Sequence, residues 1–361
     1  MSLVPSLLGS LVPTLVPPIA AVHLINTVAP VVSGISYNGQ TMTTTDGTWA
    51  SSSTPTYSYQ WQSSSDSGSI YSNIFGKTSS TYVVDSINEG LNIRCIVTAT
   101  NSVSSANQPS NAIENWIPSD DVLPEGWWDP SDDSKVTKSG GSVSEISNKT
   151  GSVKLEQIST SSQMTIGTHF LNGLNVLLGN GNQFIQTPSA SGISSSGNFS
   201  IFAIIRFDLI DNEFDGCIAV GDDGASTPNS FQLRAGDASQ FDGNFNATDI
   251  SSIFTLSGGP FMGPSIFNIE GNYGTGIKVY VDGTLRGSVS DYTTSKLSTT
   301  EPIRFLVNRG TNIPQGILSE MIHTRSVDST REKIEGYLAH KYNLMSSLPI
   351  SHPYKTNPPT V

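Results

Sequence analysis

The residues best suited to chemistry form an acidic run, "DLIDNEFDGC", near the middle of the chain. Asp211, Glu213 and Asp215 alternate with other residues, so an extended strand would place all three on one face. Two carboxylates that flank a glycosidic bond can hydrolyse it. The Asn and Gly residues of the run instead predict the tip of a hairpin between strands at 199–209 and 216–220, where the acids are solvated.

A second acidic turn, "GDDG" at 221–224, follows closely in the sequence. Carboxylate and amide oxygens at such spacing suit a hard cation, so calcium binding by the turns at 211–224 is one alternative. Solvated surface turns explain the same residues without a ligand. We favour this interpretation first, calcium binding second and catalysis last. We therefore expect no metal and no cofactor.

Five histidines are spread along the chain, at His23, His169, His323, His340 and His352. No two are four residues apart, so the zinc-binding helix motif is absent, as are a nucleophile elbow, a P-loop and a dinucleotide fingerprint. His340 is expected on the exposed side of a helix near the C-terminus. The sequence predicts no catalytic residue, and we expect that the protein is not an enzyme.

Aromatic side chains are the remaining candidates for chemistry, because sugars stack on exposed rings. Tyr273, Phe261, Tyr292 and Trp127 could serve. Single aromatic residues more often fill a core or a surface, so we leave the ligand-binding residues unassigned.

The composition indicates strands and excludes some partners. Charged residues make up 13% of the 361 residues, Gly and Pro are frequent, and alternating apolar and polar segments recur between turn signals. The net charge is −12, and the basic residues form no cluster. Binding to nucleic acid or to an anionic membrane is therefore not expected. Cys95 and Cys217 fall in different predicted domains, which excludes a disulfide within a domain.

The first 29 residues form an apolar, Pro-rich segment without charge. A secretory signal would need basic residues at its start, and the first basic residue is Lys77. A membrane helix would be broken by its prolines. We interpret residues 1–29 as a docking arm, with a disordered, adhesive tail as the alternative. The residues expected to bury themselves in a partner are Leu3, Val4, Leu7, Leu8, Leu11, Val12, Leu15, Val16 and Ile19.

Residues 30–113 are predicted to form a domain of about seven short strands. Its motifs are Gly47-Thr48-Trp49, Tyr59-Gln60-Trp61 and the run from Cys95 to Asn101. This segment resembles bacterial and phage immunoglobulin-like modules. The resemblance implies that Trp61 is the core tryptophan and that Cys95 lacks its disulfide partner, because Met42 stands near that place. Such modules are usually spacers or weak surface binders.

After a predicted linker at 114–124, residues 125–346 are predicted to form a second all-β domain, followed by a tail at 347–361. Its motifs are Trp128-Asp129-Pro130, Val279-Tyr280-Val281-Asp282-Gly283 and the closing run "EKIEGYLAHKYNL". These segments resemble concanavalin A-like, laminin-G-like jelly rolls. Asp282-Gly283 predicts a hairpin turn. Ile334, Tyr337, Leu338 and Tyr342 share one face of a short helix that is expected to lie on a sheet.

An apolar arm, an immunoglobulin-like sandwich and a concanavalin A-like jelly roll occur together in structural proteins of tailed bacteriophages. This resemblance implies a virion surface protein, either a capsid decoration protein or a tail- or fibre-associated protein. The arm would bind capsid or tail proteins and sister subunits of a homo-oligomer, and the lectin-like head would bind surface glycans. Without a signal peptide, the protein would be made in the host cytoplasm. The alternatives are a bacterial cell-surface adhesin or carbohydrate-binding module and, ranked last, a polysaccharide hydrolase.

Overall fold

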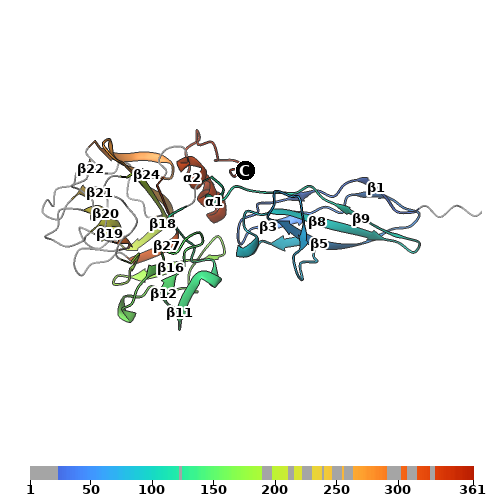
Figure 1. The fold of residues 1–361 in the computed structure, drawn as a ribbon, viewed down its shortest axis with the longest axis horizontal. Coiled ribbons are helices and arrows are strands. Elements are labelled where there is room, and N and C mark those ends of the chain that lie inside the picture. Colours follow the sequence, from blue (N-terminus) through green and yellow to red (C-terminus); the bar gives the residue numbers. More distant parts are fainter. Residues whose placement is uncertain are drawn as a thin grey trace, which may run out of the picture.

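The computed structural model describes residues 23–121, 124–188, 197–209, 215–221, 230–237, 240–245, 254–255, 263–290, 302–306, 315–325 and 330–361. These residues form antiparallel strands with two α-helices, arranged as two β-sandwiches that lie end to end (Figure 1). The predicted all-β fold class is confirmed. In these stretches, neither helix is long and apolar enough to cross a membrane.

The first sandwich is built from short strands. A three-stranded sheet in the order β2-β3-β7 faces a four-stranded sheet in the order β6-β5-β8-β9, and β1 pairs with β4. The bounds are β1 (Ile25–Val28), β2 (Val32–Ser33), β3 (Thr41–Thr44), β4 (Thr48–Ala50), β5 (Thr56–Ser64), β6 (Ser72–Asn73), β7 (Thr81–Val83), the 3-10 helix η1 (Ser86–Asn88), β8 (Asn92–Thr100) and β9 (Ser105–Pro109).

The core of the first sandwich follows the alternation of β8, in which every second residue is buried. Trp61 on β5 is fully buried and lies opposite Cys95 on β8. Met42 belongs to the same buried cluster. Cys95 is a free cysteine, and burial raises the pKa of its thiol to about 11. Apolar packing therefore holds this core where a disulfide could have stood.

The start of the described chain is part of this first sandwich. β1 pairs with β4 through Ile25 opposite Ala50, and the backbone N–H of Leu24 donates to the hydroxyl of Ser104. The predicted arm at 1–29 thus includes a segment that forms a strand of the sandwich. The nine arm residues named above, from Leu3 to Ile19, lie outside the described residues.

The second sandwich has two large sheets. One runs β10-β27-β18-β23-β24-β25, with β16 also paired to β27, and the other runs β11-β12-β13-β17-β26-β19-β20-β21-β22. The bounds are β10 (Gly126–Trp128), β11 (Val136–Ser139), β12 (Ser142–Ile146), β13 (Leu155–Glu156), β14 (Phe170–Leu171), β15 (Leu174–Asn175), β16 (Leu177–Asn180), β17 (Ile185–Gln186), β18 (Phe199–Leu209), β19 (Asp215–Gly221), β20 (Ser230–Asp237), β21 (Gln240–Phe245), β22 (Phe254–Thr255), β23 (Ser265–Asn272), β24 (Gly276–Val281), β25 (Thr284–Val289), β26 (Ile303–Phe305) and β27 (Gln315–Thr324).

Two predicted hairpins have different outcomes. β24 and β25 form a hairpin, and its turn residues Asp282 and Gly283 both have positive φ, +50° and +74°. Asp-Gly is the pair that such a turn favours, so this prediction is confirmed. The hairpin predicted between 199–209 and 216–220 is wrong. β18 belongs to the seven-stranded sheet and β19 to the nine-stranded sheet, because their apolar faces meet across the core.

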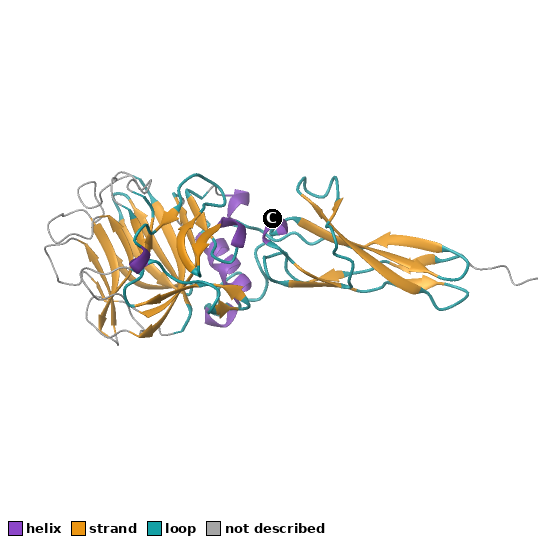
Figure 2. Cartoon of the chain, turned by 90° about the horizontal axis from the view of Figure 1, so that it is seen from below, coloured by secondary structure: helices purple, strands orange, loops and turns teal. Residues whose placement is uncertain are grey.

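The helix α2 (Arg331–Tyr342) covers part of the outer face of the seven-stranded sheet. Its predicted apolar face is buried against Phe202, Ile204, Ile266 and Ile322 of that sheet. Figure 2 shows this helix in the region where the two sandwiches meet. The remaining helical segments are α1 (Pro118–Asp121), η2 (Asp133–Lys135), η3 (Thr160–Ser162) and η4 (Met345–Ser347).

The C-terminal segment packs on the other side of α2. The Nε2 of His340 lies 2.9 Å from the backbone oxygen of Tyr354, and the backbone N–H of Trp116 donates to the oxygen of Pro359 at 3.0 Å. The expectation that His340 is exposed is therefore wrong, because the helix is covered on two sides. Burial lowers the pKa of His340.

Candidate functional site

Five charged side chains are buried where the two sandwiches meet. We call Glu89, Asp129, Lys149, Glu320 and Lys341 the junction cluster. Glu89 comes from a turn of the first sandwich, and the other four come from the second sandwich. Gly90 follows Glu89 with φ +76°, and a Cβ there would lie 2.7 Å from the side chain of Ile117. The Asn-Glu-Gly turn therefore packs closely against the connecting segment, and Glu89 next to it reaches Lys149 of the second sandwich.

Lys341 is the centre of the cluster. Its Nζ lies 2.8 Å from Glu89 Oε1, 2.7 Å from Asp129 Oδ2 and 2.9 Å from Glu320 Oε2. The Nζ of Lys149 lies 2.6 Å from Glu89 Oε2 and 3.5 Å from Asp129 Oδ2. Each ammonium group thus contacts Glu89 of the first sandwich and at least one carboxylate of the second. The cluster therefore links the two sandwiches directly.

Aromatic donors complete the cluster around Glu320. The indole N–H of Trp127 donates to Glu320 Oε1, and the hydroxyl of Tyr342 donates to Oε2 at 3.1 Å. The hydroxyl of Tyr337 lies 2.8 Å from Glu320 Oε1 and 3.1 Å from Glu89 Oε1. A phenol has one proton to donate, so it cannot satisfy two ionised carboxylates at once. This arrangement favours one additional proton within the cluster.

The pKa shifts identify the carboxyl group that best retains this proton. Burial disfavours every charge in the cluster. For Asp129 and Glu89, the ammonium groups of Lys341 and Lys149 outweigh burial and hold the carboxyl pKa below its ordinary value. For Glu320, burial outweighs Lys341, and the neighbouring carboxylates act in the same direction, so the pKa is raised. One proton on Glu320 would leave two carboxylates facing two ammonium groups.

Aromatic packing surrounds the junction cluster on the side of the first sandwich. The rings of Tyr37 and Tyr337 meet edge to face with centroids 4.9 Å apart, and the rings of Trp127 and Tyr337 are 6.0 Å apart. The hydroxyl of Tyr37 donates to the backbone oxygen of Trp116 at 2.9 Å. Trp116, which lies in the predicted linker, is fully buried. The contact between the sandwiches therefore resembles a continuous core rather than a hinge.

At the opposite end of α2, the outer face of the seven-stranded sheet becomes polar. Its register aligns five residues across five strands, each opposite the next. They are Thr324 on β27, Ser200 on β18, Glu270 on β23, Lys278 on β24 and Ser288 on β25. The row passes from buried at Thr324 to exposed at Ser288.

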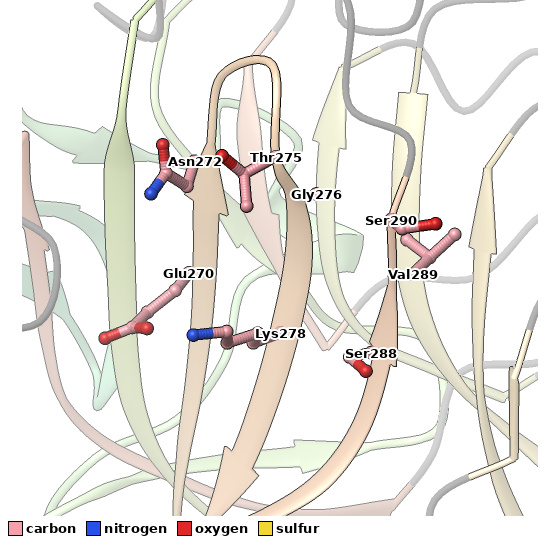
Figure 3. Close-up of a pocket in the computed structure, with 8 residues that line it drawn as sticks. All are labelled: Glu270, Asn272, Thr275, Gly276, Lys278, Ser288, Val289 and Ser290. Carbon is pink, nitrogen blue, oxygen red and sulfur yellow. The ribbon is translucent and has the colours of Figure 1, made fainter.

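A groove of about 200 Å³ lies on the exposed half of this row. Figure 3 shows the side chains of Glu270 and Lys278 at one level of the sheet, with Asn272 and Thr275 nearer the hairpin tip. We call it the outer-face groove, and its lining residues are Glu270, Asn272, Thr275, Gly276, Lys278, Ser288, Val289 and Ser290. It is the candidate binding site of the second sandwich, and no sequence motif had indicated it.

Arg331, the first residue of α2, fixes the inner edge of the groove. Its Nε lies 3.7 Å from Glu270 Oε1, and its Nη1 donates to Glu335 Oε2 at 2.8 Å. The guanidinium also lies 4.2 Å from the ring centre of Tyr280. Burial would lower the pKa of Arg331, but the carboxylates, Glu335 foremost, raise it. Arg331 therefore stays charged and compensates the buried carboxylate of Glu270.

The residues singled out in the sequence do not form a site of their own. Trp127 is buried in the junction, whereas Tyr273 is 41% exposed in the hairpin between β23 and β24. Phe261 and Tyr292 lie outside the described residues. So do Asp211 and Glu213 and most of the turn at 221–224, while Asp215 begins β19 with a side chain that is not described. Among the described residues, no group of His, Cys, Asp or Glu is arranged to hold a metal ion.

Comparisons with known proteins give distant similarities of fold. No family model matches the chain, and no curated protein matches it. The Trypanosoma rangeli sialidase bound to the inhibitor DANA is 12% identical with a TM-score of 0.44; the match covers 68% of this chain and 42% of the sialidase. Domain 4 of a Geobacillus stearothermophilus arabinanase, bound to arabinotriose, is 11% identical with a TM-score of 0.37, covering 57% of this chain and 93% of that domain.

A third similar structure is the binding domain of a paraclostridial mosquitocidal protein. It is 14% identical with a TM-score of 0.42, and the match covers 62% of this chain and 53% of that one. The chain thus spans less than two thirds of the length of this protein and of the sialidase. At such identities the similarity concerns the fold alone. The strands and sheets of the described residues themselves define a two-unit β-sandwich protein.

Proposed function

We propose that this chain is a structural surface protein that holds its second sandwich at a fixed orientation on the first. In this proposal, the immunoglobulin-like first sandwich is a stem, and the concanavalin A-like second sandwich is a glycan-binding head without enzymatic activity. The N-terminal arm anchors the protein to capsid or tail proteins of a tailed-phage virion and to sister subunits. The junction cluster is the observation that carries this proposal.

The junction cluster makes the contact between the two sandwiches rigid. Moving a charge from water into a protein interior costs several kcal/mol unless it is well paired. Glu89 is paired only while the first sandwich keeps its place against Lys149 and Lys341 of the second. A swinging motion would break these ion pairs and would also expose the buried contact between the rings of Tyr37 and Tyr337. The closed arrangement is therefore strongly preferred, which suits display more than hinged closure on a substrate.

The direction of the chain supports the assignment of stem and head. Residues 23 and 24 lead into β1, which lies toward the end of the first sandwich remote from the second (Figure 1). The preceding residues are attached there. The outer-face groove lies on the second sandwich. The point where the chain enters the first sandwich and the groove are therefore at opposite ends of the described structure, as a display protein requires.

The test of the anchor compares the full chain with a chain that lacks residues 1–22, because this truncation leaves β1 intact. Light scattering gives the assembly state, and co-sedimentation measures binding to phage particles assembled without the gene. A matched pair replaces Leu7 and Leu11 by serine, or Ser6 and Ser10 by alanine, within the same arm.

We expect the truncated chain and the variant with Leu7 and Leu11 replaced by serine to remain folded and to lose docking. The variant with Ser6 and Ser10 replaced by alanine should dock like the full chain. Apolar burial would explain this difference, since each buried leucine contributes about 1.5–3 kcal/mol. Equal docking of the full and truncated chains would show that the anchor is not in the arm. Absence of docking by any form would remove the virion proposal.

A further inference from the structure

We infer that the outer-face groove binds one uncharged sugar unit through neighbouring hydroxyl groups, with Glu270 as acceptor and Lys278 as donor. This inference rests on the proposed display of the second sandwich as a head, and it assigns the head a site and a ligand class.

The polar groups of the outer-face groove have fixed positions. Glu270 and Lys278 are directly opposite each other on β23 and β24, and Ser288 is opposite Lys278 on β25. Such cross-strand neighbours have Cβ atoms about 4.5–5.5 Å apart. Most of the lining residues stand on paired strands, and Arg331 contacts Glu270 from the start of α2 on the same face of the sheet. A site on strands keeps its geometry better than a site on loops.

The outer-face groove is lined by charges of both signs. Arg331 compensates Glu270, whereas no carboxylate of the described residues lies within salt-bridge distance of Lys278. An anionic ligand would meet Glu270, with Glu332 and Glu335 close behind it through Arg331. A cationic ligand would meet Lys278. Because charges of both signs line the groove, an uncharged ligand avoids either repulsion.

The hydrogen-bonding groups of the groove suit the hydroxyl groups of a sugar. Each sugar hydroxyl can donate one hydrogen bond and accept others. A carboxylate only accepts and an ammonium only donates, so one hydroxyl can bridge from Lys278 to Glu270. Asn272 can both donate and accept, and the hydroxyls of Thr275 and Ser288 can serve adjacent positions. The groove thus offers donors and acceptors side by side, which neighbouring hydroxyl groups require.

The size of the groove limits the ligand to one sugar ring. The groove holds about 200 Å³, below the ~300–1,000 Å³ of pockets that enclose drug-sized ligands. It fits one ring of a longer chain, whose other rings extend over the surface. Tyr273, between the lining residues Asn272 and Thr275, offers an exposed ring near such a neighbour. A single ring binds weakly, and many displayed copies would raise the overall affinity.

The experiment uses the full chain and ligand-observed saturation-transfer NMR. The uncharged probes are maltohexaose, cellohexaose, mannohexaose and galactohexaose. The charged probes are oligogalacturonate, which is anionic, and chitosan oligomers, which are cationic. The test variants are Lys278→Met, which removes the donor, and Ser288→Trp, which fills the groove from an exposed position. Lys135→Met is the matched control, because Lys135 is a half-buried lysine at the end of η2, outside the groove.

We expect at least one uncharged probe to bind and both charged probes to bind more weakly. Lys278→Met should weaken binding about ten- to hundred-fold, as expected for a lost hydrogen bond to a charged group, and Ser288→Trp should abolish it. Lys135→Met should bind like the wild type, and thermal melts should show all variants folded.

Three results would overturn the inference: no uncharged probe binds, a charged probe binds best, or binding survives both groove variants. These results leave the docking measurement untouched. Docking without sugar binding removes the groove assignment alone, whereas sugar binding without docking removes the virion anchor alone.

Discussion

Replacing Lys341 by methionine tests the junction cluster most severely. Methionine keeps an unbranched side chain of similar length and removes the charge. The substitution leaves Glu89, Asp129 and Glu320 buried with Lys149 as the remaining cation of the cluster. Lys149 reaches Glu89 and Asp129, so Glu320 loses its ammonium partner altogether.

The magnitude follows from the three short contacts of Lys341, at 2.7, 2.8 and 2.9 Å. Hydrogen bonds to charged groups contribute about 1.5–3 kcal/mol each. Their sum overstates the effect, because Lys149 remains beside Glu89 and Asp129 and because Glu320 is uncharged while it holds the proton assigned to it. Removing one partner of a buried ion pair typically costs about 3–5 kcal/mol, and we expect a loss of that size. For a unit of this size, the midpoint of thermal unfolding would fall by roughly 6–20 °C.

The assay is equilibrium unfolding in urea, followed by tryptophan fluorescence, with calorimetry on the same samples. Lys333→Met is the matched control on the same helix. Lys333 pairs with Asp121 at the surface, with side chains 28% and 45% exposed, and such pairs contribute about 0–1 kcal/mol. A loss below about 1 kcal/mol for Lys341→Met, or a loss equal to that of Lys333→Met, would refute the reasoning. If Lys341→Met does not fold, Glu89→Gln applies the same test from the first sandwich.

Two pH-dependent predictions follow from buried groups of the second sandwich. Burial raises the pKa of Glu320 and neighbouring lysines hold that of Asp129 low, so carboxyl NMR should show Glu320 losing its proton at higher pH than Asp129; the reverse order would contradict our assignment of the proton. The stability that the Glu320 proton contributes is present below the ordinary pKa of glutamate and is lost as the pH rises toward the folded value. Burial lowers the pKa of His323 to about 3, so the neutral form stabilises the fold fully above about pH 6.5, the unfolded value. As the pH falls from about 6.5 toward 3, His323 should lower the free energy of unfolding by about 1.4 kcal/mol per pH unit. Urea unfolding of His323→Leu should show a smaller slope, and an unchanged slope would rule out His323 as its source.

Much of the fold was predictable because local patterns determine it. Trp61 and Cys95 lie on strands whose alternation marks the buried face, and the structure buries both. Asp282-Gly283 specifies its turn by conformation alone. The apolar face of α2 was visible from helical spacing, and it contacts the sheet as expected. In each case, neighbouring residues along the chain carry the information.

The candidate sites were not predictable because their residues meet only in three dimensions. Glu89 and Lys341 are far apart in sequence. Taken singly, each would be expected to be an ordinary charged residue at the surface. The sequence marks a turn that ends at Gly90 and a Trp-Asp-Pro motif that contains Asp129. Neither pattern shows which residue its acidic side chain contacts. His340 was misplaced because helical spacing does not reveal that a C-terminal segment covers the second face. The outer-face groove depends on strand register, which sequence spacing alone does not fix.

The central claim is that the two sandwiches form one rigid body, and the distance between them tests it most directly. Spin labels on cysteines introduced at Ser53 and Ser161, both exposed, would report this distance by electron–electron double resonance. Cys217 would be replaced by serine, and Cys95 is buried with a raised thiol pKa, which protects it from labelling. We predict a single narrow distance distribution for the wild-type junction and for the surface control Glu145→Gln, and a broad distribution for Glu89→Ala combined with Lys341→Met. A broad distribution with the junction intact would contradict the claim.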